Sequence, residues 1–212
     1  MKLLKELSEA AAVPGSEEAI RKIIKRELKG KVKELKEDAM GNLIAYQPAA
    51  KKGADRLMLS AHMDEIGFYV SKVDDKGFLR VQNVGGFDPR NLFARRVKVH
   101  TKSKVLPGLM NPGITPLHTS RPEERKKIPT ISDLFIDLGM SAKAVKSKVK
   151  VGDMVTMDQK FSEVGDLVSG KALDNRVSVW LGIKILQKLK KFKYNLYCAF
   201  TCLLYTSDAA DE

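Results

Sequence analysis

Two short polar segments, far apart in the sequence, carry residue types that suit metal chemistry. The first is HMDEIG (residues 62–67), which follows an apolar run at residues 57–61. That run predicts a buried strand that delivers functional side chains at its carboxyl end. Residues two apart on a strand point to the same face, so His62 and Asp64 converge if the strand continues. The carboxylate can then accept a proton from one imidazole nitrogen and direct the other nitrogen at a metal.

A plainer interpretation of this segment is a histidine and an acid at the solvent-facing end of a strand. A motif this short occurs often by chance, and by itself it leaves both interpretations open.

The second segment is GKALDNR (residues 170–176), which immediately precedes an apolar helical run at residues 177–189. An aspartate at the start of a helix is most often an N-cap that accepts backbone N–H groups, and the segment alone favours this role for Asp174. A carboxylate at such a corner can also bridge two divalent cations, with one oxygen on each.

Together the two segments resemble the hallmark segments of the tetrahedral (TET) aminopeptidases. This family includes the glutamyl aminopeptidases and belongs to the clan MH dinuclear metallopeptidases. Four further stretches match it: MGNLI (40–44), GFLR (77–80), GGFDPR (85–90) and DLFIDLG (133–139). The order and spacing of the segments make the resemblance specific. It extends from the first helix to about Thr201.

The resemblance implies removal of N-terminal amino acids from peptides by a centre that holds two divalent ions, zinc or cobalt. It implies that His62 and Asp174 bind metal, with Asp174 bridging both ions. Asp64 is the implied catalytic residue and orients His62. The implied partners are peptide substrates and further copies of the chain, as a dimer that builds up to a dodecamer in the family.

The sequence departs from the family pattern after residue 201. The family continues with two adjacent glutamates, one the general base and the other a metal ligand, and later with an acid and a histidine. Residues 202–212 instead read CLLYTSDAADE, a foreign-looking tail, and no histidine follows Asp174. We therefore expect an incomplete metal site and a chain that is inactive as given. Nothing positions the acids of the tail (Asp208, Asp211 and Glu212) as substitutes.

Composition agrees with a globular protein. The 212 residues suffice for one core with a smaller inserted module. No apolar run is long enough to span a bilayer, and no signal-peptide h-region is present, so a cytoplasmic protein is the default expectation. Cys198 and Cys202 lie on one predicted strand and suggest neither a disulfide framework nor a four-ligand zinc site.

Two alternatives to an enzyme remain, one suggested by charge and the other by the missing metal ligands. There are 38 lysines and arginines against 26 acids, a formal net charge of +12. A basic polyanion-binding module is favoured only by that charge, because the lysines are dispersed and aromatic residues make up 7%. Nucleic acid is therefore not an expected partner. A non-enzymatic oligomerisation remnant is favoured by the missing ligands.

The predicted fold class is α/β, a mixed-sheet metallopeptidase core that is incomplete at its C-terminus. Residues 1–65 form its N-terminal part, with helices at 1–12 and 16–29, Ser16 as an N-cap, and a hairpin that ends at 43–46. Short strands punctuated by glycine and proline follow. The resemblance implies that residues 66–166 are an inserted, small all-β dimerisation domain. The core continues at 167–201, with a central strand at 195–201.

Three further side chains have ordinary explanations. His100 alternates with lysines on an amphipathic strand and is expected to be exposed, and His118 is expected to be a loop residue. The helix after Asp174 is apolar nearly all round, which predicts burial on two sides and places Trp180 in the core.

Overall fold

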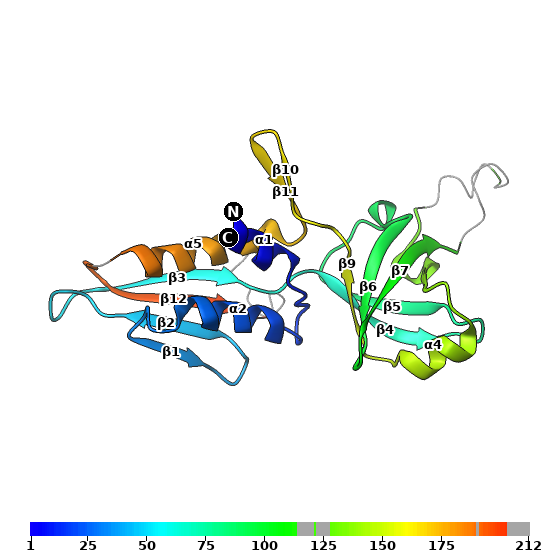
Figure 1. The fold of residues 1–212 in the computed structure, drawn as a ribbon, viewed down its shortest axis with the longest axis horizontal. Coiled ribbons are helices and arrows are strands. Elements are labelled where there is room, and N and C mark those ends of the chain that lie inside the picture. The colour runs from blue at the N-terminus through cyan, green and yellow to red at the C-terminus, as the bar shows by residue number, and fades with distance from the viewer. Residues whose placement is uncertain (114–120, 122–127, 190, 203–212) are drawn as a thin grey trace. The chain divides into compact units, whose positions relative to one another are not determined.

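The computed structural model describes residues 1–113, 121, 128–189 and 191–202. The chain forms two compact units (Figure 1). One comprises Met1–Glu65 together with the chain from Lys160 onward, and the other comprises Ile66–Gln159. In the ranges that the structure describes, no helix is long and apolar enough to cross a membrane.

The first unit is built on a four-stranded mixed sheet with the order β1-β2-β12-β3. Its strands are β1 (Glu34–Glu37), β2 (Leu43–Gln47), β3 (Arg56–His62) and β12 (Asn195–Thr201). β12 pairs antiparallel with β2 and parallel with β3. The strand predicted at 195–201 is therefore the one that joins the N-terminal hairpin to the strand that carries His62.

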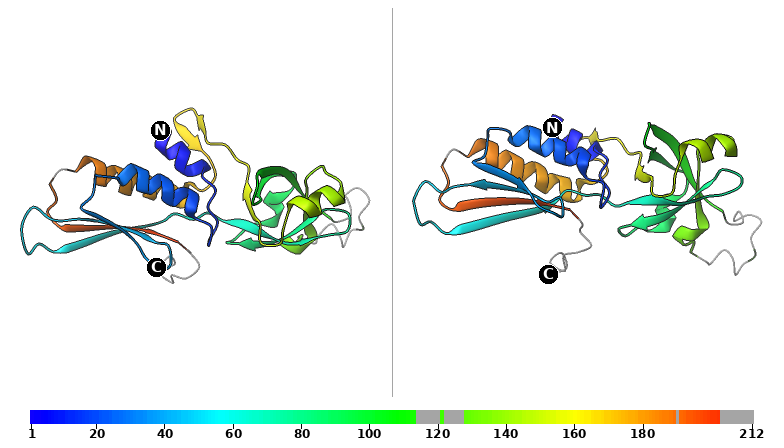
Figure 2. Two further views of the ribbon diagram at one scale, coloured as in Figure 1. Left: turned by 60° about the horizontal axis from the view of Figure 1, so that its bottom comes forward. Right: turned by 90° about the horizontal axis from the view of Figure 1, so that it is seen from below.

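The described part of this unit has three helices: α1 (Lys2–Glu9), α2 (Glu18–Leu28) and α5 (Leu173–Lys188). Figure 2 shows α2 and α5 side by side over one face of the sheet. The core between them contains Leu43 and Phe200 from the sheet, Ile24 from α2 and Ile183 from α5. Gly182 lets α5 approach β12, because a Cβ at this position would lie 2.7 Å from the Cys198 sulfur.

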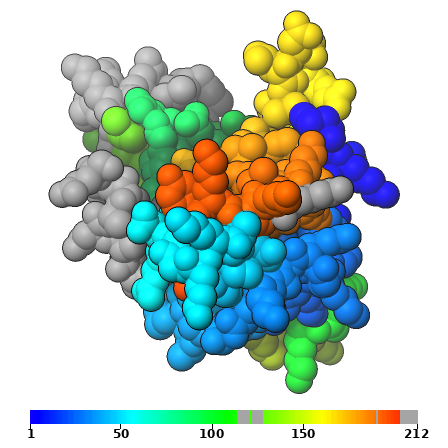
Figure 3. All heavy atoms as spheres, turned by 90° about the vertical axis from the view of Figure 1, so that its left-hand side faces the viewer, coloured from blue at the N-terminus to red at the C-terminus, as the bar shows by residue number. Residues whose placement is uncertain are grey.

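Asn195 anchors the start of β12 to the chain that leads into β3. Its backbone N–H donates to Asp55 O at 2.8 Å, and its side-chain amide donates to Ala54 O at 2.7 Å. Figure 3 shows this end of the unit, where the cyan connection before β3 lies beside the orange start of β12. These bonds fix the parallel register that brings Thr201 opposite His62.

The strand that was predicted to be buried is exposed over its first half. Leu57 and Met58 are 42% and 62% exposed, whereas Ala61 is 5% exposed. The reason is topological: within the described chain β3 is an edge strand that pairs with β12 alone. Packing therefore covers only the end of β3 that leads to His62.

Two predictions about helices are also wrong. α2 begins at Glu18, and its N-cap is Glu17, whose side chain forms no cap bond. Ser16 lies one position before the cap, in a turn where its N–H donates to Val13 O. α5 is not buried on two sides, since Leu181 is 46% exposed on a helix that packs against the sheet on the opposite side. Trp180 is partly buried and packs against the core, as expected.

The second unit is a closed barrel with the strand order β4-β5-β8-β7-β6-β9. The strands are β4 (Gly67–Val73), β5 (Leu79–Val84), β6 (Arg95–His100), β7 (Val105–Pro112), β8 (Leu134–Asp137) and β9 (Met154–Met157). The 3-10 turns η1 (Pro89–Leu92) and η2 (Ile131–Asp133) lie between strands. A helix, α4 (Ala142–Lys148), buries Val145 in the barrel core, so the unit is not purely β.

The barrel unit ends at Gln159 and not at residue 166. The hairpin of β10 (Ser162–Val164) and β11 (Leu167–Ser169) belongs to the first unit. Phe161 holds it there, because this residue is 7% exposed and its N–H donates to Glu9 Oε1 at 3.0 Å.

His100 is half-buried and not exposed, because its Nε2 lies 2.9 Å from Thr156 Oγ1 on the neighbouring strand β9. His118 and residues 203–212 of the tail predicted at 202–212 lie outside the described residues.

Candidate metal centre

The end of β3 brings His62 and Asp64 together. Nδ1 of His62 lies 3.2 Å from Oδ1 of Asp64, and the two side chains are 13% and 4% exposed. The backbone between them stays attached to the sheet, since Met63 N–H donates to Thr201 O at 2.8 Å. With Nδ1–H donated to the carboxylate, Nε2 carries the lone pair and is the nitrogen available to a ligand.

Asp174 reaches the same histidine from the loop that precedes the regular part of α5. Its Oδ1 lies 3.4 Å from His62 Nε2. The backbone is non-helical at Asp174 and Asn175, the peptide bond between them is cis, and the N-cap of α5 is Ala172. Among the described residues the Asp174 carboxylate has His62 as its hydrogen-bond partner, so the N-cap interpretation is wrong.

Two carboxylates therefore face opposite nitrogens of one imidazole ring. Burial lowers the pKa of His62, but hydrogen bonds and negative charge from Asp64 and Asp174 outweigh burial and raise the pKa above its ordinary value of 6.5. In the protonated ring Nε2 also carries a proton, which a cation that binds there has to displace, so its affinity rises as the ring loses that proton with increasing pH.

The donor atoms fit a divalent transition metal. Zinc and cobalt accept imidazole nitrogen and carboxylate oxygen as ligands. Two such ligands at about 2.1 Å from a tetrahedral ion lie about 3.4 Å apart, and the separation of His62 Nε2 and Asp174 Oδ1 is 3.4 Å. In the part of the chain that the structure describes, no cluster of three or more candidate metal ligands is present.

Three buried charged side chains that had no predicted role lie on the same two segments as these ligands. Lys171 Nζ lies 2.6 and 2.7 Å from the two carboxylate oxygens of Glu65, and these side chains are 8% and 3% exposed. Arg176 is fully buried. The sequence held one signal of a role for Lys171 and Arg176, because these two residues flank Asp174 just before an apolar helix.

Burial lowers the pKa of Arg176 to about 10, although Glu65 and Asp64 favour its charged form. The guanidinium is therefore still charged at neutral pH, close to two carboxylates.

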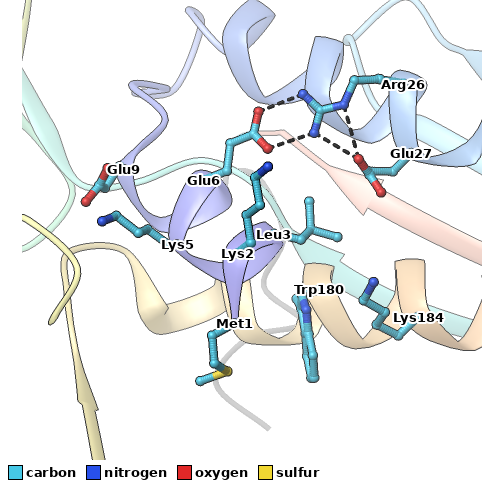
Figure 4. A pocket seen from close by; sticks show the side chains of 10 residues that line it. All are labelled: Met1, Lys2, Leu3, Lys5, Glu6, Glu9, Arg26, Glu27, Trp180 and Lys184. Atoms are coloured by element: carbon cyan, nitrogen blue, oxygen red, sulfur yellow. Dashed lines mark hydrogen bonds and ion pairs between the residues drawn. The ribbon is translucent and has the colours of Figure 1, made fainter. Parts of the chain in front are cut away.

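A separate surface depression of about 860 Å³ lies among α1, α2 and α5 (Figure 4). Trp180 and Lys184 line it on α5, and Arg26 on α2 forms two 2.7 Å bonds to Glu6 on α1. His62, Asp64 and Asp174 do not line this depression. The candidate centre is thus defined by its donor atoms and not by this cavity.

Similar proteins share both the sequence and the fold. A putative aminopeptidase from Acetivibrio thermocellus is 36% identical over 200 residues, which cover 94% of this chain and 57% of that protein. The structure of a TET aminopeptidase from the marine sediment archaeon Thaumarchaeota archaeon has a TM-score of 0.89 at 29% identity, over 98% of this chain and 59% of that one.

The Pyrococcus horikoshii TET1 peptidase, which can assemble into a tetrahedron or a large octahedral shell, has a TM-score of 0.82 at 33% identity. The match covers 95% of this chain and 60% of that peptidase. The chain thus spans less than two thirds of the length of these relatives. The family model of the M42 glutamyl aminopeptidases matches residues 41–203. The chain belongs to the M42 glutamyl aminopeptidase family.

Proposed function

We propose that this chain carries part of the metal centre of an aminopeptidase that removes N-terminal residues from peptides with two divalent cations, zinc or cobalt. The observation that supports the proposal most directly is the 3.4 Å separation of His62 Nε2 and Asp174 Oδ1. The two donors come from segments 112 positions apart and meet at the end of a sheet strand. Membership of a peptidase family favours this function over polyanion binding.

Each of the three residues has a distinct proposed role. His62 would bind a cation through Nε2, and Asp64 holds the ring by accepting Nδ1–H. Asp174, whose side chain is 97% exposed, would be the ligand that the two cations share. Bound cations of this kind would activate a water molecule and polarise the scissile carbonyl.

We further propose that the barrel unit, residues 66–159, mediates assembly of copies of the chain. The support comes from the relative in Pyrococcus horikoshii, which can assemble into a tetrahedron or a large octahedral shell. Peptide substrates follow from the proposed reaction.

The described residues support only weak metal binding and no turnover by this chain alone. Two donors leave the remaining positions of a tetrahedral ion to water. A general base must lie within hydrogen-bond reach of the attacking water. Among the described residues, the two acids that follow His62 are already engaged, because Asp64 bonds to His62 and Glu65 bonds to Lys171.

Calorimetric titration with zinc tests the metal site. We expect weak binding to the unmodified chain and none to His62→Ala or Asp174→Ala, while the barrel variant His100→Ala serves as the matched histidine control. Tight binding that survives His62→Ala would contradict the assignment. Aminoacyl chromogenic substrates with added zinc or cobalt test turnover, and metal-dependent hydrolysis abolished by Asp174→Ala would show that the chain is competent by itself.

A further inference from the structure

The C-terminal end of α1 and the residues that follow it contact both segments that carry the candidate metal ligands. Glu65, next to Asp64, exchanges two bonds with Ala12: Glu65 N–H donates to Ala12 O at 2.8 Å, and Ala12 N–H donates to Glu65 Oε1 at 3.1 Å. Ser8 Oγ–H donates to Lys171 O at 2.6 Å in a buried contact. One short stretch of chain therefore holds the 64–65 segment and the 171–176 loop at once.

Lys171 links these two segments directly. Its ammonium group donates to both oxygens of Glu65 and to Ala10 O, the last at 3.3 Å. All three hydrogens of the ammonium are thereby engaged, and the group is almost fully buried. The backbone before Lys171 is held just as closely, since a Cβ at Gly170 would lie 2.7 Å from Ser8 Oγ.

Arg176 attaches the other end of the loop to the same helix. Its Nη1 donates to the carbonyl oxygens of Leu7 and Ala10, at the C-terminal end of α1, where the helix dipole favours a cation. Arg176 and Lys171 bring two positive charges into this buried region, and Glu65 and Asp64 bring two negative charges. The opposite charges offset one another, which lowers the cost of burying them.

Asp174 lies between these two anchors, three positions after Lys171 and two before Arg176. Its side chain is 97% exposed, so its own packing cannot fix where its carboxylate lies. Apart from the contact with His62, the position is set through the backbone, from the buried side chains on either side of it.

We propose that Lys171 and Arg176 are positioning residues that clamp the 171–176 loop to the end of α1 and to Glu65, and so hold the Asp174 carboxylate beside His62. This inference rests on the proposed metal centre. Under this proposal α1 contributes to metal affinity, although no residue of α1 is a candidate ligand.

The test separates positioning from stability with a single and a double variant. Lys171→Met leaves the buried Glu65 carboxylate without its ion-pair partner. The stability of this variant to urea should therefore fall. Glu65→Gln/Lys171→Met removes both charges, so stability should largely recover. If the clamp positions Asp174, zinc affinity stays about 10–100-fold lower in both variants, or is lost, because the link between the segments is absent from both. Lys188→Met, at an exposed lysine of α5, is the control and should match the unmodified chain.

A second readout does not depend on metal. Amide hydrogen exchange of the metal-free chain should show faster exchange at residues 173–177 in both variants, relative to the amides of β12. Zinc affinity that recovers with stability in the double variant, or unchanged exchange at 173–177, would overturn the clamp. If the unmodified chain binds no zinc through His62 and Asp174, the proposed function fails, and hydrogen exchange alone then decides whether the clamp orders the loop.

Discussion

His62 and Asp64 share a hydrogen bond of 3.2 Å between Nδ1 and Oδ1 at the end of β3. The bond leaves Nε2 pointing at Asp174, so one side chain joins the sheet to the non-helical segment that precedes the regular part of α5. The buried Asp64 selects the tautomer, and the exposed Asp174 supplies a second donor atom. The imidazole orientation, the charge of the ring and the metal affinity should all depend on this relationship.

We expect the stability of the chain to carry a pH dependence that His62 causes. Because the folded-state pKa of His62 is raised above 6.5, its stabilising contribution is fully present below that value and is lost as the pH rises through the folded pKa. Urea unfolding at about pH 5.5 and about pH 8.5 should therefore show a larger loss of stability in the unmodified chain than in His62→Gln. Equal losses in the two proteins would mean that the two carboxylates do not perturb the histidine.

Asp64→Asn should leave the fold intact and weaken zinc binding. The amide keeps the shape of the side chain but removes the negative charge that orients and polarises the ring, and changes of this kind typically cost about 10–100-fold in affinity. Competition with a chromophoric chelator measures the change, with circular dichroism as the check on folding. An affinity equal to that of the unmodified chain would make Asp64 a structural acid only.

Gly182→Ala should destabilise the first unit, although alanine favours a helix over glycine by about 1 kcal/mol. The added methyl would lie 2.7 Å from Cys198 Sγ and 3.1 Å from Phe200 Cε1, and overpacking of a core costs about 1–3 kcal/mol. Gly86→Ala, where a Cβ meets nothing within 4 Å, is the control for a glycine substitution without a clash. A higher melting temperature for Gly182→Ala would show that α5 can move away from β12 without loss.

Met58→Lys should reduce self-association without lowering stability. Met58 is 62% exposed on β3, which has an unpaired edge within the described chain. A charge on an edge strand opposes pairing with another chain. Light scattering at increasing protein concentration measures the effect. The control is Lys51→Met, which makes the opposite change of residue type in the loop before β3. Scattering that does not change in Met58→Lys would place the association elsewhere.

Several features of this protein were predictable from local pattern alone. The alternation and punctuation of residues 67–112 indicate the strands of the barrel, since period-two patterns bounded by glycine and proline report on pleated backbone. The apolar run at 195–201 predicts the central strand. The pairing of His62 with Asp64 also follows locally, because it needs only the two-residue repeat of a strand.

The tertiary structure decided the features that depend on contacts between distant segments. Leu57 and Met58 have the composition of a buried strand but are exposed, because burial depends on which strands and helices lie beside β3. The meeting of Asp174 with His62, and of Lys171 with Glu65, joins positions more than a hundred residues apart. The secondary-structure propensity of a local segment cannot predict such pairs. Only the packing of α1 against α5, and of α5 against the sheet, brings these charges together.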